Sequence, residues 1–105
     1  MAFETVASTE ELGPGNRIIV EVGDLWVIVF NVDGRYYAFE DRCTHDDGSF
    51  DSGSIDQQAI ECPRHGARFS LEDGKPTMPA TKPVPRFAVR VEGQTVQVDI
   101  TQRLN

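Results

Sequence analysis

The cysteines and histidines of this chain lie in one short window, and they are the side chains best suited to hold a transition metal. The 105 residues include two cysteines and two histidines, arranged as Cys43-Thr44-His45 and, after sixteen further residues, Cys62-Pro63-Arg64-His65. Thiolate and imidazole are ligands that soft and borderline metal ions prefer. Two Cys/His pairs, with no Cys or His elsewhere in the sequence, therefore predict a metal site.

The spacing within the pairs narrows the kind of metal centre. Structural zinc sites usually separate paired ligands by about two to four residues, whereas Thr44 alone separates Cys43 from His45. Two neighbouring irons relax this constraint, because each pair can then direct its cysteine to one iron and its histidine to the other. A [2Fe–2S] cluster in which two histidines replace two cysteines on one iron has this arrangement.

The same residues resemble the motif of a known family, the Rieske ferredoxins, in which Cys-x-His is followed further along the chain by Cys-x-x-His-Gly. The matching residues are Cys43, His45, Cys62, His65 and Gly66. The resemblance extends over nearly the whole chain and includes a proline-bearing loop near residues 79–85. It implies one Rieske-type [2Fe–2S] cluster, with the two cysteines as thiolate ligands of one iron and the two histidines as imidazole ligands of the other.

Departures from the high-potential members of that family bear on the reduction potential. Where those members carry two further cysteines, joined by a disulfide, this chain has Gly48 and Arg64. Where they carry Ser and Tyr hydroxyls that donate hydrogen bonds to sulfur, it has Ala67 and Phe69. Each missing donor leaves more negative charge on sulfur and so favours the oxidised cluster. We expect a midpoint potential of about −150 mV, at the low end of the Rieske range.

Composition and charge restrict the partners that the chain can have. Hydrophobic residues make up 39% and charged residues 26% of the sequence, an ordinary balance for one small globular domain. The formal charge of −7 disfavours nucleic acid and anionic membrane surfaces, and it favours a protein partner with a basic docking face. The same acidity could instead serve only to keep a small protein in solution.

Nothing in the sequence indicates secretion or membrane insertion. Residues 1–5 carry neither a basic segment nor an apolar run of signal-peptide length, and no stretch approaches the length of a membrane span. Both cysteines belong to the metal motif, so they do not indicate an oxidising compartment. We expect a cytoplasmic monomer.

Short strands and tight turns dominate the rest of the sequence. β-Branched and aromatic runs predict strands at residues 3–6, 17–22, 25–32, 35–40, 67–71, 87–91 and 95–100, and one within 54–61. Gly23-Asp24 and Asp33-Gly34 predict hairpin turns, and residues 8–12 predict a capped helical turn. The run 25–32 is nearly continuous apolar, which predicts the most buried strand, with Trp26 or Phe30 in the core.

The stretch 76–85 holds four of the six prolines, which stiffen a loop and are excluded from a central strand. The family resemblance implies that this loop covers one side of the cluster. A stiff connector between two strands would have the same composition, and both interpretations stay open here.

The pattern predicts an all-β fold, an antiparallel sandwich or barrel formed by a single domain of residues 1–105. The resemblance implies that a cluster-binding part, about residues 41–85, is inserted between its strands. It further implies a one-electron carrier and not an enzyme, because no open coordination position is indicated. Such a carrier would be the ferredoxin component that passes electrons from a flavin-dependent reductase to a non-haem iron oxygenase, such as a dioxygenase.

Three other functions remain open from the sequence. A zinc-stabilised binding module would use the same ligand types. A thiol enzyme with Cys62 as nucleophile and His65 as base has no evident third group to orient that base, and it leaves Cys43 and His45 unexplained. The same domain could also be the small subunit of another reductase or a ferredoxin of iron–sulfur assembly, a choice that depends on its partners.

Overall fold

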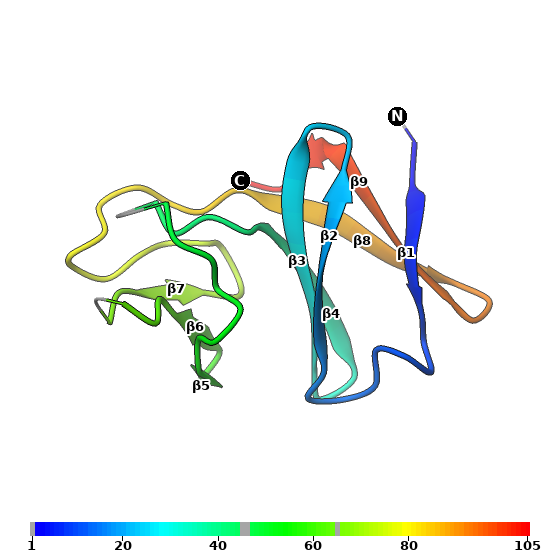
Figure 1. Cartoon of the computed structure of the whole chain (residues 1–105), viewed down its shortest axis with the longest axis horizontal. Coiled ribbons are helices and arrows are strands. Elements are labelled where there is room, and N and C mark those ends of the chain that lie inside the picture. Colours follow the sequence, from blue (N-terminus) through cyan, green and yellow to red (C-terminus); the bar gives the residue numbers. More distant parts are fainter. Residues whose placement is uncertain (1, 45–46, 65) are drawn as a thin grey trace.

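The computed structural model describes residues 2–44, 47–64 and 66–105, and the regular secondary structure of these residues is β-strand (Figure 1). The strands are β1 (Glu4–Ser8), β2 (Arg17–Val22), β3 (Leu25–Val32), β4 (Arg35–Glu40), β5 (Ile55–Asp56), β6 (Ala59–Glu61), β7 (Arg68–Ser70), β8 (Arg86–Glu92) and β9 (Thr95–Arg103). The strands predicted at 17–22, 25–32 and 35–40 have the predicted bounds. The other predicted strands are present with shifted ends, and the region 54–61 contains two short strands.

The strands form two antiparallel sheets. The larger sheet has the order β1-β9-β8-β4-β3-β2, and the smaller sheet has the order β5-β6-β7. The smaller sheet follows β4 and precedes β8 in the sequence, and it lies at one end of the long axis of a molecule that measures 39 × 26 × 19 Å (Figure 1). The predicted all-β architecture, with a part inserted between the strands of the main body, is confirmed.

The predicted hairpin turns are present, and their backbone angles explain their sequences. Asp33 and Gly34 have φ angles of 52° and 92°, the left-handed values that a two-residue turn of this type needs at both positions. Gly23-Asp24 joins β2 to β3, and Val22 pairs with Leu25 across it. The capped turn at residues 8–12 also forms: the Ser8 and Glu11 main-chain N–H groups each donate to the other residue's side chain, at 3.1 and 3.0 Å.

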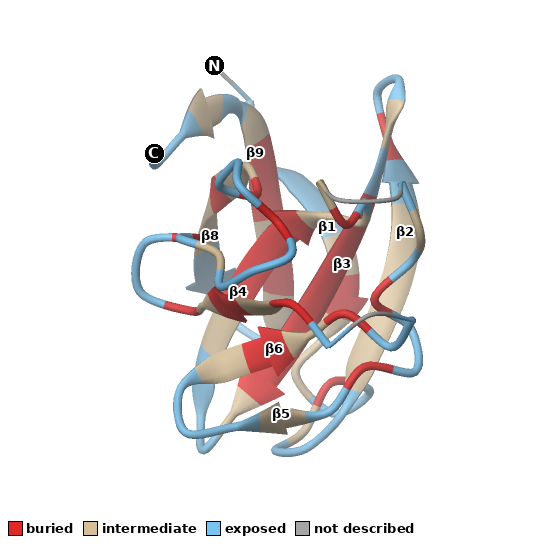
Figure 2. Ribbon diagram, turned by 90° about the vertical axis from the view of Figure 1, so that its left-hand side faces the viewer, coloured by how far each residue is buried: buried red, intermediate tan, exposed pale blue. Residues whose placement is uncertain are grey.

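Strand β3 is apolar along nearly its whole length because two hydrophobic cores cover its two faces. Val27 and Val29 pack into a core shared with β4, β8 and β9, whereas Ile28 and Phe30 pack into a second core shared with the smaller sheet. Successive residues of a strand point to opposite faces, so a strand buried on both sides cannot alternate with polar residues. Figure 2 shows buried residues along most of β3 and in parts of β4 and β6.

The structure decides between the two aromatic residues predicted for the core of β3. Phe30 is fully buried, whereas Trp26 is 56% exposed. Both side chains belong to the same face of the strand, but on β3 the second core begins at Ile28. The prediction that one of the two lies in the core is confirmed by Phe30. Trp26 is exposed because it lies at the end of the strand next to the Gly23-Asp24 turn.

A buried carboxylate shapes the end of β9. Ala88 pairs with Asp99 and Phe87 with Arg103, so β9 bulges between these two pairs. Asp99 is 1% exposed, and its carboxylate accepts hydrogen bonds from the Thr101 N–H at 2.9 Å, the Thr101 hydroxyl at 2.6 Å and the Gln102 amide at 2.9 Å. These hydrogen bonds give both carboxylate oxygens a donor and hold the bulge closed. Beyond the bulge, Arg103 pairs again with Phe87 of β8.

The hydrogen bonds from Gln102 and Thr101 lower the pKa of Asp99 below its ordinary value, while burial opposes them. A carboxyl group with a depressed folded-state pKa stabilises the fold above its unfolded pKa of about 3.9, and it loses that contribution as pH falls through the folded value. We expect Asp99→Asn to lower the unfolding free energy more at pH 7 than at pH 3, measured by urea denaturation. Asp24→Asn, which removes an exposed carboxylate, is the control; an equal loss for Asp99→Asn at both pH values would contradict the prediction.

Across the described ranges, 2–44, 47–64 and 66–105, no helix has the length and apolar character needed to cross a membrane.

Candidate metal centre

The two cysteines occupy equivalent positions in two loops of the same length. Cys43 begins the loop 43–48 and donates its N–H to the Gly48 carbonyl at 2.7 Å, while Asp47 donates its N–H to the Cys43 carbonyl at 2.8 Å. The loop 62–67 repeats this pattern: Cys62 donates to Ala67 at 2.6 Å, and Gly66 donates to Cys62 at 3.1 Å. The backbone therefore presents each cysteine at the start of an identically closed loop.

The fifth residue of each loop also matches. Asp47 has a φ of 63° and Gly66 a φ of 78°, both in the left-handed region. Glycine enters this region without strain, and aspartate is among the few other residues that tolerate it. Gly66 is part of the sequence motif, but the equivalent position of Asp47 was missed. An aspartate followed by Gly48 is a turn signal that could have found it.

Both cysteine side chains are fully buried, and the two, which both lie among the described residues, are not joined by a disulfide. They belong to the second core, where the Phe50 ring meets the Phe69 ring edge-on with centroids 5.3 Å apart. This core keeps water away from two thiols, the donors that iron–sulfur clusters use. The donor chemistry and the matched loops fit a [2Fe–2S] cluster held by one cysteine from each loop.

The two predicted histidine ligands, His45 and His65, lie outside the described residues. In the sequence, they follow Cys43 and Cys62 by two and three residues, respectively. The four-residue ligand set therefore stays a prediction. Ala67 and Phe69 stand where high-potential relatives have hydroxyl groups, and both are fully buried. Their side chains have no N–H or O–H group, so they offer no hydrogen-bond donor.

Arg17 on β2 joins the main sheet to the segment between the two cysteine loops. Its guanidinium donates to the main-chain carbonyls of Phe50 at 3.1 Å, Asp51 at 3.2 Å and Gly53 at 2.7 Å. A planar guanidinium can donate several hydrogen bonds at once, which suits it to a bend where carbonyls converge. This role of Arg17 could not be predicted from the sequence, since no local pattern links an arginine to carbonyls more than thirty residues away.

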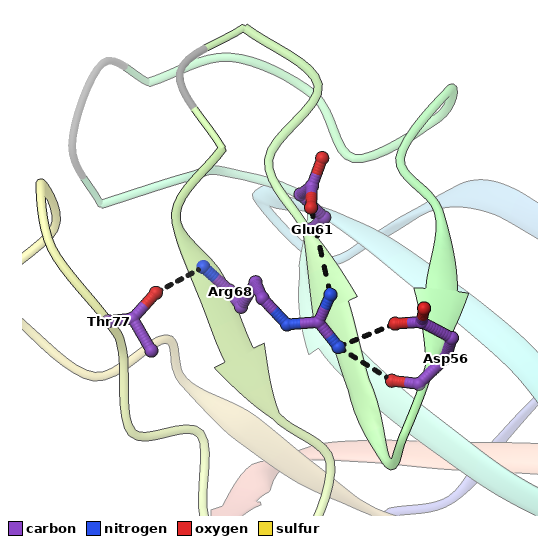
Figure 3. Close-up of polar contacts among 4 residues, drawn as sticks. All are labelled: Asp56, Glu61, Arg68 and Thr77. Atoms are coloured by element: carbon purple, nitrogen blue, oxygen red, sulfur yellow. Dashed lines mark hydrogen bonds and ion pairs between the residues drawn. The ribbon is translucent and has the colours of Figure 1, made fainter.

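Arg68 organises the smaller sheet in a similar way (Figure 3). Its guanidinium contacts the Asp56 carboxylate and carbonyl and lies 3.7 Å from the Glu61 carboxylate, while its N–H donates to the Thr77 hydroxyl at 2.9 Å. These contacts connect all three short strands with the start of the proline-rich loop. Each ion pair is partly exposed and contributes little to the stability of the fold on its own. The main effect of Arg68 is therefore to fix the relative positions of the three strands and the loop.

The proline-rich loop, residues 76–85, packs against the first cysteine loop. The Thr44 hydroxyl donates to the Lys82 carbonyl at 2.6 Å. Two residues further along the loop, the Val84 carbonyl accepts a hydrogen bond from the Asn105 amide at 2.9 Å, and the same amide donates to the Asp73 carbonyl, just before the loop, at 3.0 Å. The loop is thus tied to the residue next to Cys43. That it covers one side of a bound cluster stays a prediction.

Comparison with known families supplies the deciding observation, because the Rieske [2Fe-2S] domain matches residues 2–88. The chain belongs to this Rieske family. The ferredoxin component of biphenyl 2,3-dioxygenase from Rhodococcus jostii (strain RHA1) is 35% identical to the Rieske chain over 101 residues, which cover 95% of this chain and 94% of that protein. The 3-phenylpropionate/cinnamic acid dioxygenase ferredoxin subunit of Escherichia coli (strain K12) is 40% identical over 78 residues, which cover 72% and 74%.

Solved structures share the fold of the Rieske chain. A chain from the complex of reduced oxygenase and oxidized ferredoxin in carbazole 1,9a-dioxygenase matches with a TM-score of 0.88 and 34% identity, over 98% of this chain and 97% of that one. A putative NADH-dependent nitrite reductase small subunit from Mycobacterium tuberculosis matches with a TM-score of 0.83 at 22% identity. The fold alone therefore does not distinguish a dioxygenase ferredoxin from a reductase subunit.

Proposed function

We propose that this Rieske chain is the ferredoxin component of a multicomponent non-haem iron dioxygenase, a one-electron carrier between a flavin-dependent reductase and the oxygenase. The observation that carries the proposal is the agreement with dioxygenase ferredoxins at 34–35% identity over at least 94% of both chains. The reductase subunit agrees at only 22% identity. The carrier would work in the cytoplasm, where cysteines are kept reduced.

The residues proposed to hold the cluster are Cys43 and Cys62 on one iron and His45 and His65 on the other. When bound, the cluster would supply reversible one-electron chemistry at a potential above that of all-cysteine ferredoxins, because neutral imidazoles replace two anionic thiolates. The buried thiols and the matched loops support the cysteine half of this assignment.

The protein contributes a rigid, dry setting for that chemistry. Main-chain bonds fix both cysteine loops, Arg17 ties the segment between them to β2, and Thr44 ties the first loop to the proline-rich loop. A site fixed in this way needs little rearrangement when its charge changes.

Metal and sulfide analysis tests whether the protein holds a [2Fe–2S] cluster, and electron-transfer measurements test whether it passes electrons to an oxygenase. Purified protein should contain two irons and two acid-labile sulfides per chain, and dithionite reduction should give the EPR spectrum of a mixed-ligand [2Fe–2S] cluster. The reduced protein should then be reoxidised by a dioxygenase's terminal oxygenase in stopped-flow absorbance measurements. Zinc without sulfide would contradict the cofactor; a cluster that no oxygenase reoxidises would contradict the role only.

Ala67 offers a test of the low expected potential. Ala67→Ser would place a hydroxyl beside Cys62, where it can donate to sulfur and stabilise the reduced state. A hydrogen bond to a charged group contributes about 1.5–3 kcal/mol, and about 1.4 kcal/mol corresponds to 59 mV for one electron, so we expect a rise on the order of 60–130 mV. The midpoint is measured by dye-mediated titration. The control Ala38→Ser adds a hydroxyl to the core that contains Val27 and Val29, and it should leave the midpoint potential unchanged. A wild-type midpoint potential above zero would refute the expectation of a low potential.

A further inference from the structure

Three cationic side chains line one groove of this acidic protein. The groove has a volume of about 460 Å³, and its walls include Arg42, Thr44 and Asp47 at the first cysteine loop, Lys82 and Pro83 of the proline-rich loop, and Arg103 at the end of β9. Among the wall residues that the structure describes, three cations and one carboxylate give a formal charge of +2. The whole chain carries −7, so the remainder of the molecule carries −9.

The positive charges come from segments that only the fold brings together. Arg42 follows β4, Lys82 lies in the inserted part and Arg103 follows the β9 bulge that Asp99 closes. Arg42 lies 3.6 Å from the Glu40 carboxylate and 3.6 Å from the Asp47 carboxylate, and its side chain remains 53% exposed. Lys82 and Arg103 are exposed as well. These cations are therefore open to a partner and are not enclosed as a small-ion site would be.

The groove is formed before any partner binds. The hydrogen bond from the Thr44 hydroxyl to the Lys82 carbonyl joins its two main walls at 2.6 Å. Main-chain bonds hold the first cysteine loop, and the Asn105 side chain holds the proline-rich loop at Val84. A preformed surface loses little conformational entropy on association. Its wall residue Thr44 is also the direct neighbour of Cys43, so a partner seated here lies next to the proposed electron site.

We propose that this groove, Arg42 with Lys82 and Arg103, docks an acidic segment on the surface of the terminal oxygenase. The inference rests on the proposed function and adds the charge pattern of the partner's face. Most of this chain is acidic and favours basic partner surfaces, whereas the groove requires carboxylates at one position. A positive spot in a negative surface fixes the orientation of the encounter, because only one alignment satisfies both signs.

Charge reversal with a matched control tests the groove. The double variant Lys82→Glu/Arg103→Glu and the control Lys75→Glu/Arg90→Glu both change the net charge from −7 to −11, and Lys75 and Arg90 lie outside the groove. Binding of cluster-loaded proteins to the terminal oxygenases of the carbazole and biphenyl systems is measured by surface plasmon resonance at several salt concentrations. We expect Kd to rise about tenfold or more for the groove variant, with a weaker salt dependence, and much less for the control.

The possible results separate the groove from the proposed function. If the two double variants weakened binding equally, or if the wild-type protein bound neither oxygenase, the docking assignment would be wrong. Neither result would change the EPR signal of the cluster or contradict the carrier role. Weakened binding only to a flavin reductase would show that the assigned partner is wrong. Saturable millimolar binding of inorganic phosphate, lost in the groove variant without any change in oxygenase affinity, would identify a small-anion site and also overturn the proposal.

Discussion

Replacing Cys62 with alanine should give a colourless protein that retains neither iron nor acid-labile sulfide. The thiolate is one of two proposed ligands of one iron, and alanine has no donor to replace it. The alternative is that Cys62 is a small apolar core residue, as buried cysteines often are. In that case the variant would keep its cluster and lose only a little stability. Iron and sulfide counts on freshly purified and reconstituted protein decide between the two.

A core variant separates ligand loss from general damage. Val84→Ala removes apolar volume from the same buried core without removing a metal donor. It should cost on the order of 1–3 kcal/mol of unfolding free energy and keep the cluster. Full iron and sulfide in Cys62→Ala would show that the ligand set is wrong. Loss of the cluster in Val84→Ala as well would mean that the site depends on packing more than on this thiolate.

Gly53→Ala should destabilise the cluster-binding part severely, although it adds only one methyl group. A Cβ at this position would lie 2.1 Å from the main-chain carbonyl oxygen of Glu61 and 3.3 Å from that of Phe50. Both obstacles are main-chain atoms, so either residue 53 or the main chain at Glu61, which immediately precedes Cys62, has to move. We expect a loss of about 2–4 kcal/mol and a lower iron content, measured by thermal denaturation and metal analysis.

Gly13→Ala provides the matched control for this prediction. It makes the same chemical change in a loop of the main body, where the nearest atom to the added Cβ is the Asn16 amide nitrogen at 4.0 Å. This variant should melt near the wild-type temperature with full iron. If Gly53→Ala behaved like the control, the close approach of residues 53 and 61 would not exist in solution.

The sequence by itself determined the features that depend on neighbouring residues. The Cys-x-His and Cys-x-x-His-Gly motifs specify the kind of centre, because rare ligand types at fixed spacing have few other uses. The Asp33-Gly34 hairpin was readable because the left-handed angles at both positions favour these residue types. The turn at Gln57-Gln58 was not readable, since neither residue is a turn signal. Its φ angles of 48° and 61° follow from the pairing of β5 with β6.

The tertiary structure alone decided how the site is held together. The matching of the two cysteine loops, the contacts of Arg17 with carbonyls 33–36 residues away and the gathering of Arg42, Lys82 and Arg103 around one groove involve residues that are distant in the chain. The exposure of Trp26 likewise depends on where the second core ends. Local patterns carry no record of such contacts, because their energy comes from packing and hydrogen bonds that exist only after the two sheets have come together.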